Sequence, residues 1–298
     1  MNERTCRLLA AFFLAAGLGL GYWPVQPGSA PAQADQSKAA VPLAEADQPI
    51  KVLLFAGNDQ HRWHNWEKTT PAIKQLLERD ARIRVEVSHD IEDLARKPLA
   101  DFQVIVQNYV NWHDPKGPSE AARSAFVKFL QAGGGLVVVH FANGAFHHSL
   151  PRAAESDWPE YRKMVRRVWD HMPKDGQPKS GHDSFGKFSV LVTELKHPIT
   201  EGLKRFEVTD ELYFNQHGSE PIEPLIAAES KVTKRAEPLA WASSYGKGRV
   251  FQTLLGHSEK TYDAFEAREM LRRATAWTAG REVRPLDPAK DVPAGPKP

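Results

Sequence analysis

The stretch that decides the fold is Gly246–Phe251, with the sequence GKGRVF, followed closely by Gly256–Glu259, with the sequence GHSE. Two glycines around a lysine predict a tight turn, and the apolar residues after them predict a short buried strand. A similar run lies upstream, where Gly133–Gly135 precedes the apolar segment Leu136–Val139 and then His140. Both predicted strands therefore end beside a histidine, which places candidate chemistry at the strand ends.

Strand and helix patterns alternate along most of the chain. Short apolar or alternating runs predict strands, and apolar residues recurring every three or four positions predict helices. The predicted strands are Ile50–Gly57, Arg82–Ser88, Phe102–Gln107, Leu136–His140, Phe188–Thr193, Leu225–Ala228, Leu239–Ser244 and Arg249–Leu254. The predicted helices are Trp66–Arg79, Ser119–Gln131, Trp158–Trp169 and Glu259–Ala279. This alternation predicts an α/β fold with a doubly wound, mostly parallel sheet flanked by helices, and a His- and Trp-rich insertion.

The N-terminal segment predicts export. Arg4 and Arg7 precede the apolar run Leu8–Leu20, and Ala32–Ala34 supplies small residues for cleavage. We therefore expect a signal peptide at 1–34, a flexible leader at 35–48, one domain at 49–281 and an extended tail at 282–298. The expected location is secreted or periplasmic, without stable membrane insertion after cleavage; an uncleaved anchor is the alternative.

Charge and cysteine content exclude several classes of function. The formal net charge is +2, which gives no electrostatic reason to bind nucleic acid or anionic lipid. Cys6 is the single cysteine and lies inside the predicted signal peptide. The mature protein would then have no disulfide, no cysteine nucleophile and no thiolate metal site.

Histidines follow several predicted strands, and the carboxyl ends of parallel strands form the binding edge of such a sheet. The nearby serines have no recognisable nucleophile sequence, so serine hydrolysis is disfavoured. Acid–base catalysis would use His257, His140, Glu211 and Glu259, whereas metal binding would use His61, His64 and His113. The metal would be divalent zinc, manganese or iron. The alternative for His257 and Glu259 is that they only cap the last helix.

Aromatic residues share these loops with amide and imidazole groups, a combination that suits a sugar. The candidate substrate-binding residues are Asn58, His61, Trp63, Tyr109, Trp112, His113 and Asn143. A flat ring can stack on the C–H face of a sugar while polar side chains bind its hydroxyls. The alternative is that the tryptophans pack the insertion onto the domain.

Four motifs follow one another along the chain, and their order is more specific than any one of them: Gly133–His140, His197–Ile199, Asp210–Tyr213 and Gly246–His257. Together they resemble the ThuA-like domain family, which is named for trehalose utilisation and has the class I glutamine amidotransferase-like, flavodoxin-like fold. The resemblance implies that fold and a carbohydrate substrate. His140 falls at the nucleophile position of the amidotransferases, so glutaminase activity is not expected. His257 and Glu259 match the His-x-Glu of those enzymes, with Ser258 where proline is usual.

Two hypotheses of function follow. The first is an exported enzyme that acts on a glycoside or keto-sugar by His/carboxylate acid–base chemistry, with or without a metal. The second is a non-catalytic sugar-binding or accessory protein that uses the same cleft. The insertion at 151–186 could be a lid, a dimer surface or a solvated helix. The sequence names neither the sugar nor the oligomeric state.

Overall fold

The computed structural model of the chain describes residues 48–59, 62–174 and 176–286. These residues belong to one compact unit. The predicted signal peptide, nearly all of the predicted leader and the tail from residue 287 lie outside the described residues. Within the described ranges, no helix is both long and apolar enough to cross a membrane.

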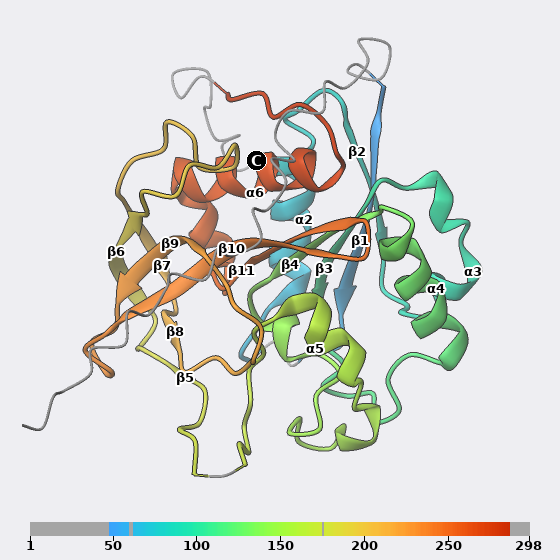
Figure 1. Cartoon of the computed structure of the whole chain (residues 1–298), viewed down its shortest axis with the longest axis horizontal. Coiled ribbons are helices and arrows are strands. Elements are labelled where there is room, and N and C mark those ends of the chain that lie inside the picture. Colours follow the sequence, from blue (N-terminus) through green and yellow to red (C-terminus); the bar gives the residue numbers. More distant parts are fainter. Residues whose placement is uncertain (1–47, 60–61, 175, 287–298) are drawn as a thin grey trace, which may run out of the picture. The chain divides into compact units, whose positions relative to one another are not determined.

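A nine-stranded sheet forms the centre of this unit (Figure 1). Its strands are β1 (Ile50–Gly57), β2 (Ile83–Ser88), β3 (Val104–Tyr109), β4 (Gly135–Val139), β6 (Gly186–Val192), β7 (Phe206–Asp210), β9 (Pro224–Glu229), β10 (Ala236–Tyr245) and β11 (Gly248–Thr253). The order across the sheet is β2-β1-β3-β4-β11-β10-β9-β6-β7. The first five strands in this order are parallel, and the last four are joined by antiparallel pairing. β5 (Gly181–His182) and β8 (Tyr213–Phe214) form a separate antiparallel pair.

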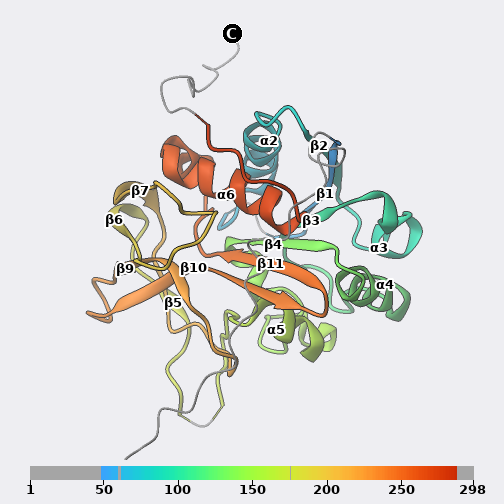
Figure 2. The same cartoon turned by 45° about the horizontal axis from the view of Figure 1, so that its top comes forward.

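Helices cover both faces of the sheet. They are α2 (Trp66–Leu77), α3 (Asp93–Arg96), α4 (Glu120–Gln131), α5 (Pro159–Val165) and α6 (Phe265–Thr278), with 3₁₀ turns η2 (Leu99–Asp101), η3 (His140–Gly144), η4 (Ala154–Ser156) and η5 (Glu259–Asp263). Figure 2 shows α2 and α6 on one face and α4 and α5 on the other. The predicted doubly wound α/β architecture is therefore confirmed.

Local sequence explains the main elements. β1 is an almost continuous apolar run, and seven of its eight residues are buried, as expected for a parallel strand covered on both faces. Asn65 caps α2 by accepting the N–H of Lys68, and Ser119 caps α4 by accepting the N–H of Ala122. Each cap fixes where a helix begins after a strand-end loop, and so positions the loops that carry the candidate residues.

The second half of the chain departs from the sequence prediction in three places. The last helix begins at Phe265 instead of Glu259, because η5 comes first and Ala264 is extended. Strands β7 and β8 occupy a region that the sequence pattern did not mark as strands. In the insertion, α5 ends at Val165, where Arg166 adopts a left-handed conformation with φ of 59°. Tyr161, Met164 and Val165 are buried, so α5 is a packed helix and not a solvated one.

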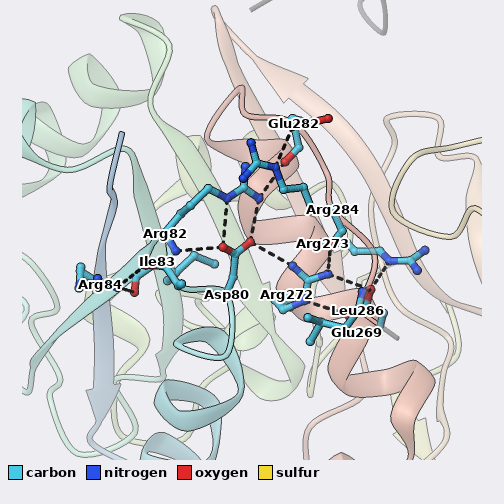
Figure 3. Close-up of polar contacts among 11 residues, drawn as sticks. Asp80, Arg82, Ile83, Arg84, Glu269, Arg272, Arg273, Glu282, Arg284 and Leu286 are labelled. Atoms are coloured by element: carbon cyan, nitrogen blue, oxygen red, sulfur yellow. Dashed lines mark hydrogen bonds and ion pairs between the residues drawn. The ribbon is translucent and has the colours of Figure 1, made fainter. Parts of the chain in front are cut away.

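The start of the tail is fastened by a buried ion network (Figure 3). Glu269 on α6 accepts bonds from Arg272, Arg273 and the backbone N–H of Leu286, each between 2.7 and 2.8 Å. Arg272 also reaches Asp80 at 3.1 Å and donates to the carbonyl of Arg284. The carboxylates are surrounded by charged donors, and residues up to 286 are thereby tied to α6.

Candidate functional site

The candidate site lies where β1, β4 and β11 end. His64 follows β1, His140 follows β4 and His257 follows β11, while Glu211 lies between β7 and β8. β1 and β3 are neighbours, and the chain turns to opposite sides after them because β2 lies beyond β1. The ends of β1 and β3 therefore form the topological switch point, which is where open α/β sheets bind ligands. We call His64, His140, Glu211 and His257 the primary cluster.

His64 is oriented by a carboxylate. Its Nδ1 contacts Oδ2 of the buried Asp59, and because a carboxylate oxygen accepts, Nδ1–H is the donor. The ring also stacks on Phe141, with centroids 4.6 Å apart. Nε2 of the same ring lies 3.3 Å from the Tyr213 hydroxyl. A histidine held by a carboxylate at one nitrogen is a common arrangement for a metal ligand.

His140 occupies the sharp turn after β4. Its φ is 49°, an unusual value for a residue with a side chain. Nδ1 lies 2.7 Å from the carbonyl of Leu254, which only accepts, so the proton is on Nδ1 and the lone pair on Nε2. Gly256 makes the close approach possible, because a Cβ there would lie 2.6 Å from Cγ1 of Val139. The turn therefore presents Nε2 of His140 to the primary cluster.

Glu211 and His257 are placed by Asp210. The Asp210 carboxylate accepts the N–H of Gly256 at 2.8 Å, of His257 at 3.2 Å and of Glu211 at 2.7 Å. It also accepts the hydroxyl of Thr261 at 2.7 Å. One buried carboxylate thus joins the β7–β8 connection to the loop after β11.

The primary cluster converges on one small region. One ligand atom from each residue can be chosen so that all four lie within 4.8 Å of one another. Nδ1 of His257 is 3.1 Å from Oε2 of Glu211, which is an ion-pair distance. Oε2 is also 3.9 Å from Nε2 of His140. Three imidazoles and a carboxylate at such separations are a suitable ligand set for zinc, manganese or iron.

The protonation pattern leaves the primary cluster rich in acceptors. Tyr213 donates its hydroxyl to Nε2 of His140 at 2.7 Å, and the same oxygen is 3.3 Å from Nε2 of His64. One hydroxyl proton cannot satisfy both nitrogens. The Glu211 carboxylate faces ring nitrogens of His257 and His182, and a cation would compete with protons for these atoms.

Burial and neighbouring charges shift the pKa values here in different directions. Burial, with His64 and His257 nearby, holds the pKa of His140 well below its usual value. Burial also lowers the pKa of His257, but the Glu211 carboxylate outweighs it and the net pKa is raised. For Asp210, burial raises the pKa to about 6 even though its donors act in the opposite direction. His140 is therefore neutral at pH 7, the form in which imidazole binds metals.

Access to the primary cluster is bordered by aromatic rings. A cavity of about 20 Å³ is lined by His64, His140 and His257, enough for about one water-sized group. The ring of Phe185 lies 5.2 Å from that of His257 and is 41% exposed. Trp63 is 42% exposed and meets the edge of Trp112 at 5.1 Å. Exposed apolar rings beside a polar pocket suit a ligand with both a C–H face and hydroxyl groups.

A sequence model of the family named ThuA, described as trehalose utilisation, matches residues 51–278. The chain belongs to the ThuA family. Its fold is similar to that of a ThuA-like protein of Parabacteroides merdae, with 25% identity, a TM-score of 0.68 and coverage of 83% of this chain and 95% of that one. It is also similar to a ThuA-like protein of Bacteroides uniformis, with 19% identity, a TM-score of 0.59 and coverage of 80% and 95%. No curated protein matches the chain.

The ThuA domain of this chain unites only part of the predicted site. His64, His140, Glu211 and His257 come together, and His257 is paired with Glu211. Glu259 is exposed at the first residue of η5. His113, a predicted metal ligand, is exposed and lies outside the His/carboxylate clusters of the described residues. His61 lies outside the described residues. The catalytic roles of these residues remain predictions.

The predicted substrate-binding residues of the ThuA domain also separate into groups. Tyr109 lines the cavity, while Asn58 donates to its hydroxyl at 3.2 Å. Trp112 is buried behind the exposed Trp63. Asn143 is fully buried and donates to Gln216 at 2.8 Å, so it holds the interior of the fold together. Of these rings, Trp63 is exposed and Tyr109 lines the cavity.

Sequence reasoning missed two residues at the ThuA site. His182 lies with Nδ1 3.3 Å from Oε1 of Glu211, and its side chain is 40% exposed. Phe185 contacts His257. Both belong to the insertion, whose irregular pattern gives no register, and the pairing of β5 with β8 brings them to Glu211. The histidine content of the insertion was the one available signal.

Proposed function

We propose that this ThuA protein is an exported enzyme that processes a glycoside or keto-sugar with a divalent metal held by the primary cluster. The observation that carries the proposal is the convergence of three imidazoles and one carboxylate, whose ligand atoms lie within 4.8 Å of one another: His64, His140, His257 and Glu211. His257, whose Nδ1 is 3.1 Å from Oε2 of Glu211, adds a third imidazole to the set. The carbohydrate class rests on the family description, trehalose utilisation, and on the exposed rings of Trp63 and Phe185.

The proposed chemistry divides the work between the ion and the chain. A bound divalent ion would polarise a carbonyl or hydroxyl oxygen of the sugar. Asp59 binds Nδ1 of His64, and the Leu254 carbonyl binds Nδ1 of His140. In each ring Nε2 is then the nitrogen that would bind the ion. His182 borders Glu211, is partly exposed and can transfer a proton to or from a substrate. Asp210 keeps Glu211 and His257 together during that step.

Glutaminase chemistry is not part of the proposal. His140 occupies the turn after β4, where a cysteine nucleophile would be required, and an imidazole cannot form the thioester. The exported location rests on the sequence pattern at 1–34. N-terminal sequencing of the protein recovered outside the cytoplasm would test it, and an intact Met1 would contradict cleavage.

The test of the proposed activity is product formation on a panel of disaccharides and their keto derivatives, followed by proton NMR. Protein loaded with zinc, manganese or iron should turn over a sugar, and chelated protein should not. His257→Ala should abolish turnover, whereas His89→Gln, a histidine outside the cluster, should retain it. Turnover by metal-free protein would instead favour acid–base catalysis by the His257–Glu211 pair. Saturable binding without product would support the sugar-binding alternative.

A further inference from the structure

A second group of potential ligands lies apart from the primary cluster. His147 and His148 follow η3, and Asp170 lies in the insertion after α5. One ligand atom from each can be chosen so that all three lie within 4.8 Å of one another. We call these three residues the secondary cluster. It shares no residue with the primary cluster, and it brings together two segments that are distant in sequence.

The secondary cluster is largely withdrawn from solvent. His147 is 2% exposed and Asp170 is 7% exposed. The rings of His147 and His148 have centroids only 4.1 Å apart, so a positive charge on one ring would repel a positive charge on the other. Burial and the neighbouring His148 lower the pKa of His147 to about 4. His148 is 34% exposed, so its ring joins the buried His147 and Asp170 to the surface.

The hydrogen bonds around the secondary cluster leave a ligand atom free. Nε2 of His148 is buried and has no hydrogen-bond partner among the described residues. The other nitrogen, Nδ1, is 3.7 Å from Oδ1 of Asp157. An orphaned imidazole nitrogen costs free energy, because it has lost its water without gaining a partner. A cation would provide that partner.

Neighbouring groups can hold the ligands in place. Nδ1 of His147 is 2.7 Å from Oγ of Ser149, and the same oxygen accepts the N–H of His171 at 2.9 Å. Donation from Nδ1–H to this oxygen would leave Nε2 of His147 free to bind an ion. Oδ1 of Asp170 accepts the N–H of Met172 at 2.8 Å, which fixes the carboxylate.

A second tautomer competes with this arrangement. The N–H of Ser149 is 3.2 Å from Nδ1 of His147, which suits a ring with its proton on Nε2. In that state Nε2–H would serve Asp170 as a hydrogen-bond donor and no ion would be needed. The Ser149 hydroxyl can either accept from Nδ1–H or donate to Nδ1, so the 2.7 Å distance fits both tautomers. Nε2 of His148 has no hydrogen-bond partner among the described residues in either tautomer, and this atom is the reason for invoking a cation.

We propose that His147, His148 and Asp170 form a second site for a divalent transition ion, with Zn²⁺ as the best-suited case. Two imidazoles and one carboxylate are ligands that this ion prefers, and a water molecule would complete the coordination. The ion would fasten the insertion at Asp170 to the loop that follows His140. Its main effect would be on stability, because the ring of Phe141 separates His64 from His171, the residue after Asp170.

The experiment is a Zn²⁺ titration of metal-free full-length protein by calorimetry, with thermal unfolding measured in parallel. Wild-type protein should bind two equivalents. His148→Gln and Asp170→Asn should each lose one equivalent while His257→Gln loses the other, and His89→Gln should match the wild type. Zn²⁺ should also raise the unfolding temperature less in His148→Gln than in His257→Gln. Far-UV circular dichroism of each metal-free variant establishes that it is folded.

The outcomes separate this site from the primary cluster. Loss of binding in His148→Gln alone, with no effect of His257→Gln, would support the secondary site and contradict a metal at the primary one. Unchanged stoichiometry and affinity in both His148→Gln and Asp170→Asn would overturn the secondary site, whatever His257→Gln does. Restoration of binding by His148→Cys, a thiolate ligand in the same place, would further support it.

Discussion

The carboxylate of Asp210 accepts the backbone N–H of His257 at 3.2 Å, across 47 positions of sequence. The same fully buried carboxylate accepts the N–H of Glu211. Asp210 itself is not in the primary cluster, but it sets the separation of two residues that are. The geometry of the site therefore depends on a hydrogen-bonding centre beneath it.

Replacing Asp210 should weaken metal binding at the primary cluster. In Asp210→Asn, one acceptor oxygen becomes an NH₂ group that faces N–H donors. Loss of such a supporting interaction reduces metal affinity by about 10- to 100-fold in comparable sites. Competition with a chromophoric chelator would measure the change. Thr261→Val, which removes only one of the bonds to Asp210, should have a smaller effect; equal affinity in Asp210→Asn and wild type would contradict the role.

His182 should be needed for turnover but not for metal binding. The variant His182→Gln removes the imidazole beside Glu211, so kcat should fall by roughly 10²- to 10⁴-fold, as for loss of a general acid or base. The metal content and the unfolding temperature should stay at wild-type values. An unchanged kcat in steady-state assays on the best sugar substrate would exclude His182 from proton transfer.

The buried network around Glu269 should contribute strongly to stability. Glu269→Gln removes the carboxylate that Arg272 and Arg273 share, and Arg272 keeps only Asp80. Breaking a buried ion pair from one side costs about 3–5 kcal/mol of unfolding free energy. Urea unfolding would measure it. Glu282→Gln is the matched control, because its ion pair with Arg284 is exposed and should contribute at most about 1 kcal/mol. Similar losses in both variants would contradict the account of the network.

His197 should make the protein less stable in mild acid. Its Nδ1 accepts the N–H of Ile199 at 3.2 Å, so the ring must be neutral there. Burial, with Arg249 nearby, lowers the pKa of His197 from 6.5 to about 4. Between these values the unfolded chain binds a proton that the folded chain does not, so stability falls as pH decreases from about 6.5 to about 4.

A comparison with His197→Gln tests this dependence. Unfolding free energies measured from pH 7 to pH 4 should decrease less in the variant than in the wild type. The ring is partly exposed, so solvent reduces the effect, and a difference on the order of 1–2 kcal/mol by pH 4 is expected. Parallel curves for the two proteins would contradict the assignment to His197.

The sequence predicted the parallel half of the sheet well, because β1, β3 and β4 are apolar runs whose burial on both faces leaves a clear pattern. His140 and His257 could be placed for the same reason: each directly follows such a strand. The pairing of His257 was harder to predict. Glu259 is near in sequence, but Asp210 holds Gly256 and Thr261 so that this segment forms η5 and not the helix. Glu211 takes the position beside His257 through contacts between distant segments.

The most direct test of the central claim is anomalous diffraction from crystals of the zinc-loaded protein. The account predicts a peak about 2.0–2.2 Å from Nε2 of His64, Nε2 of His140, a ring nitrogen of His257 and a carboxylate oxygen of Glu211. Density at this position without an anomalous signal, with the Tyr213 hydroxyl or a water molecule satisfying the imidazoles, would contradict a metal at the primary cluster.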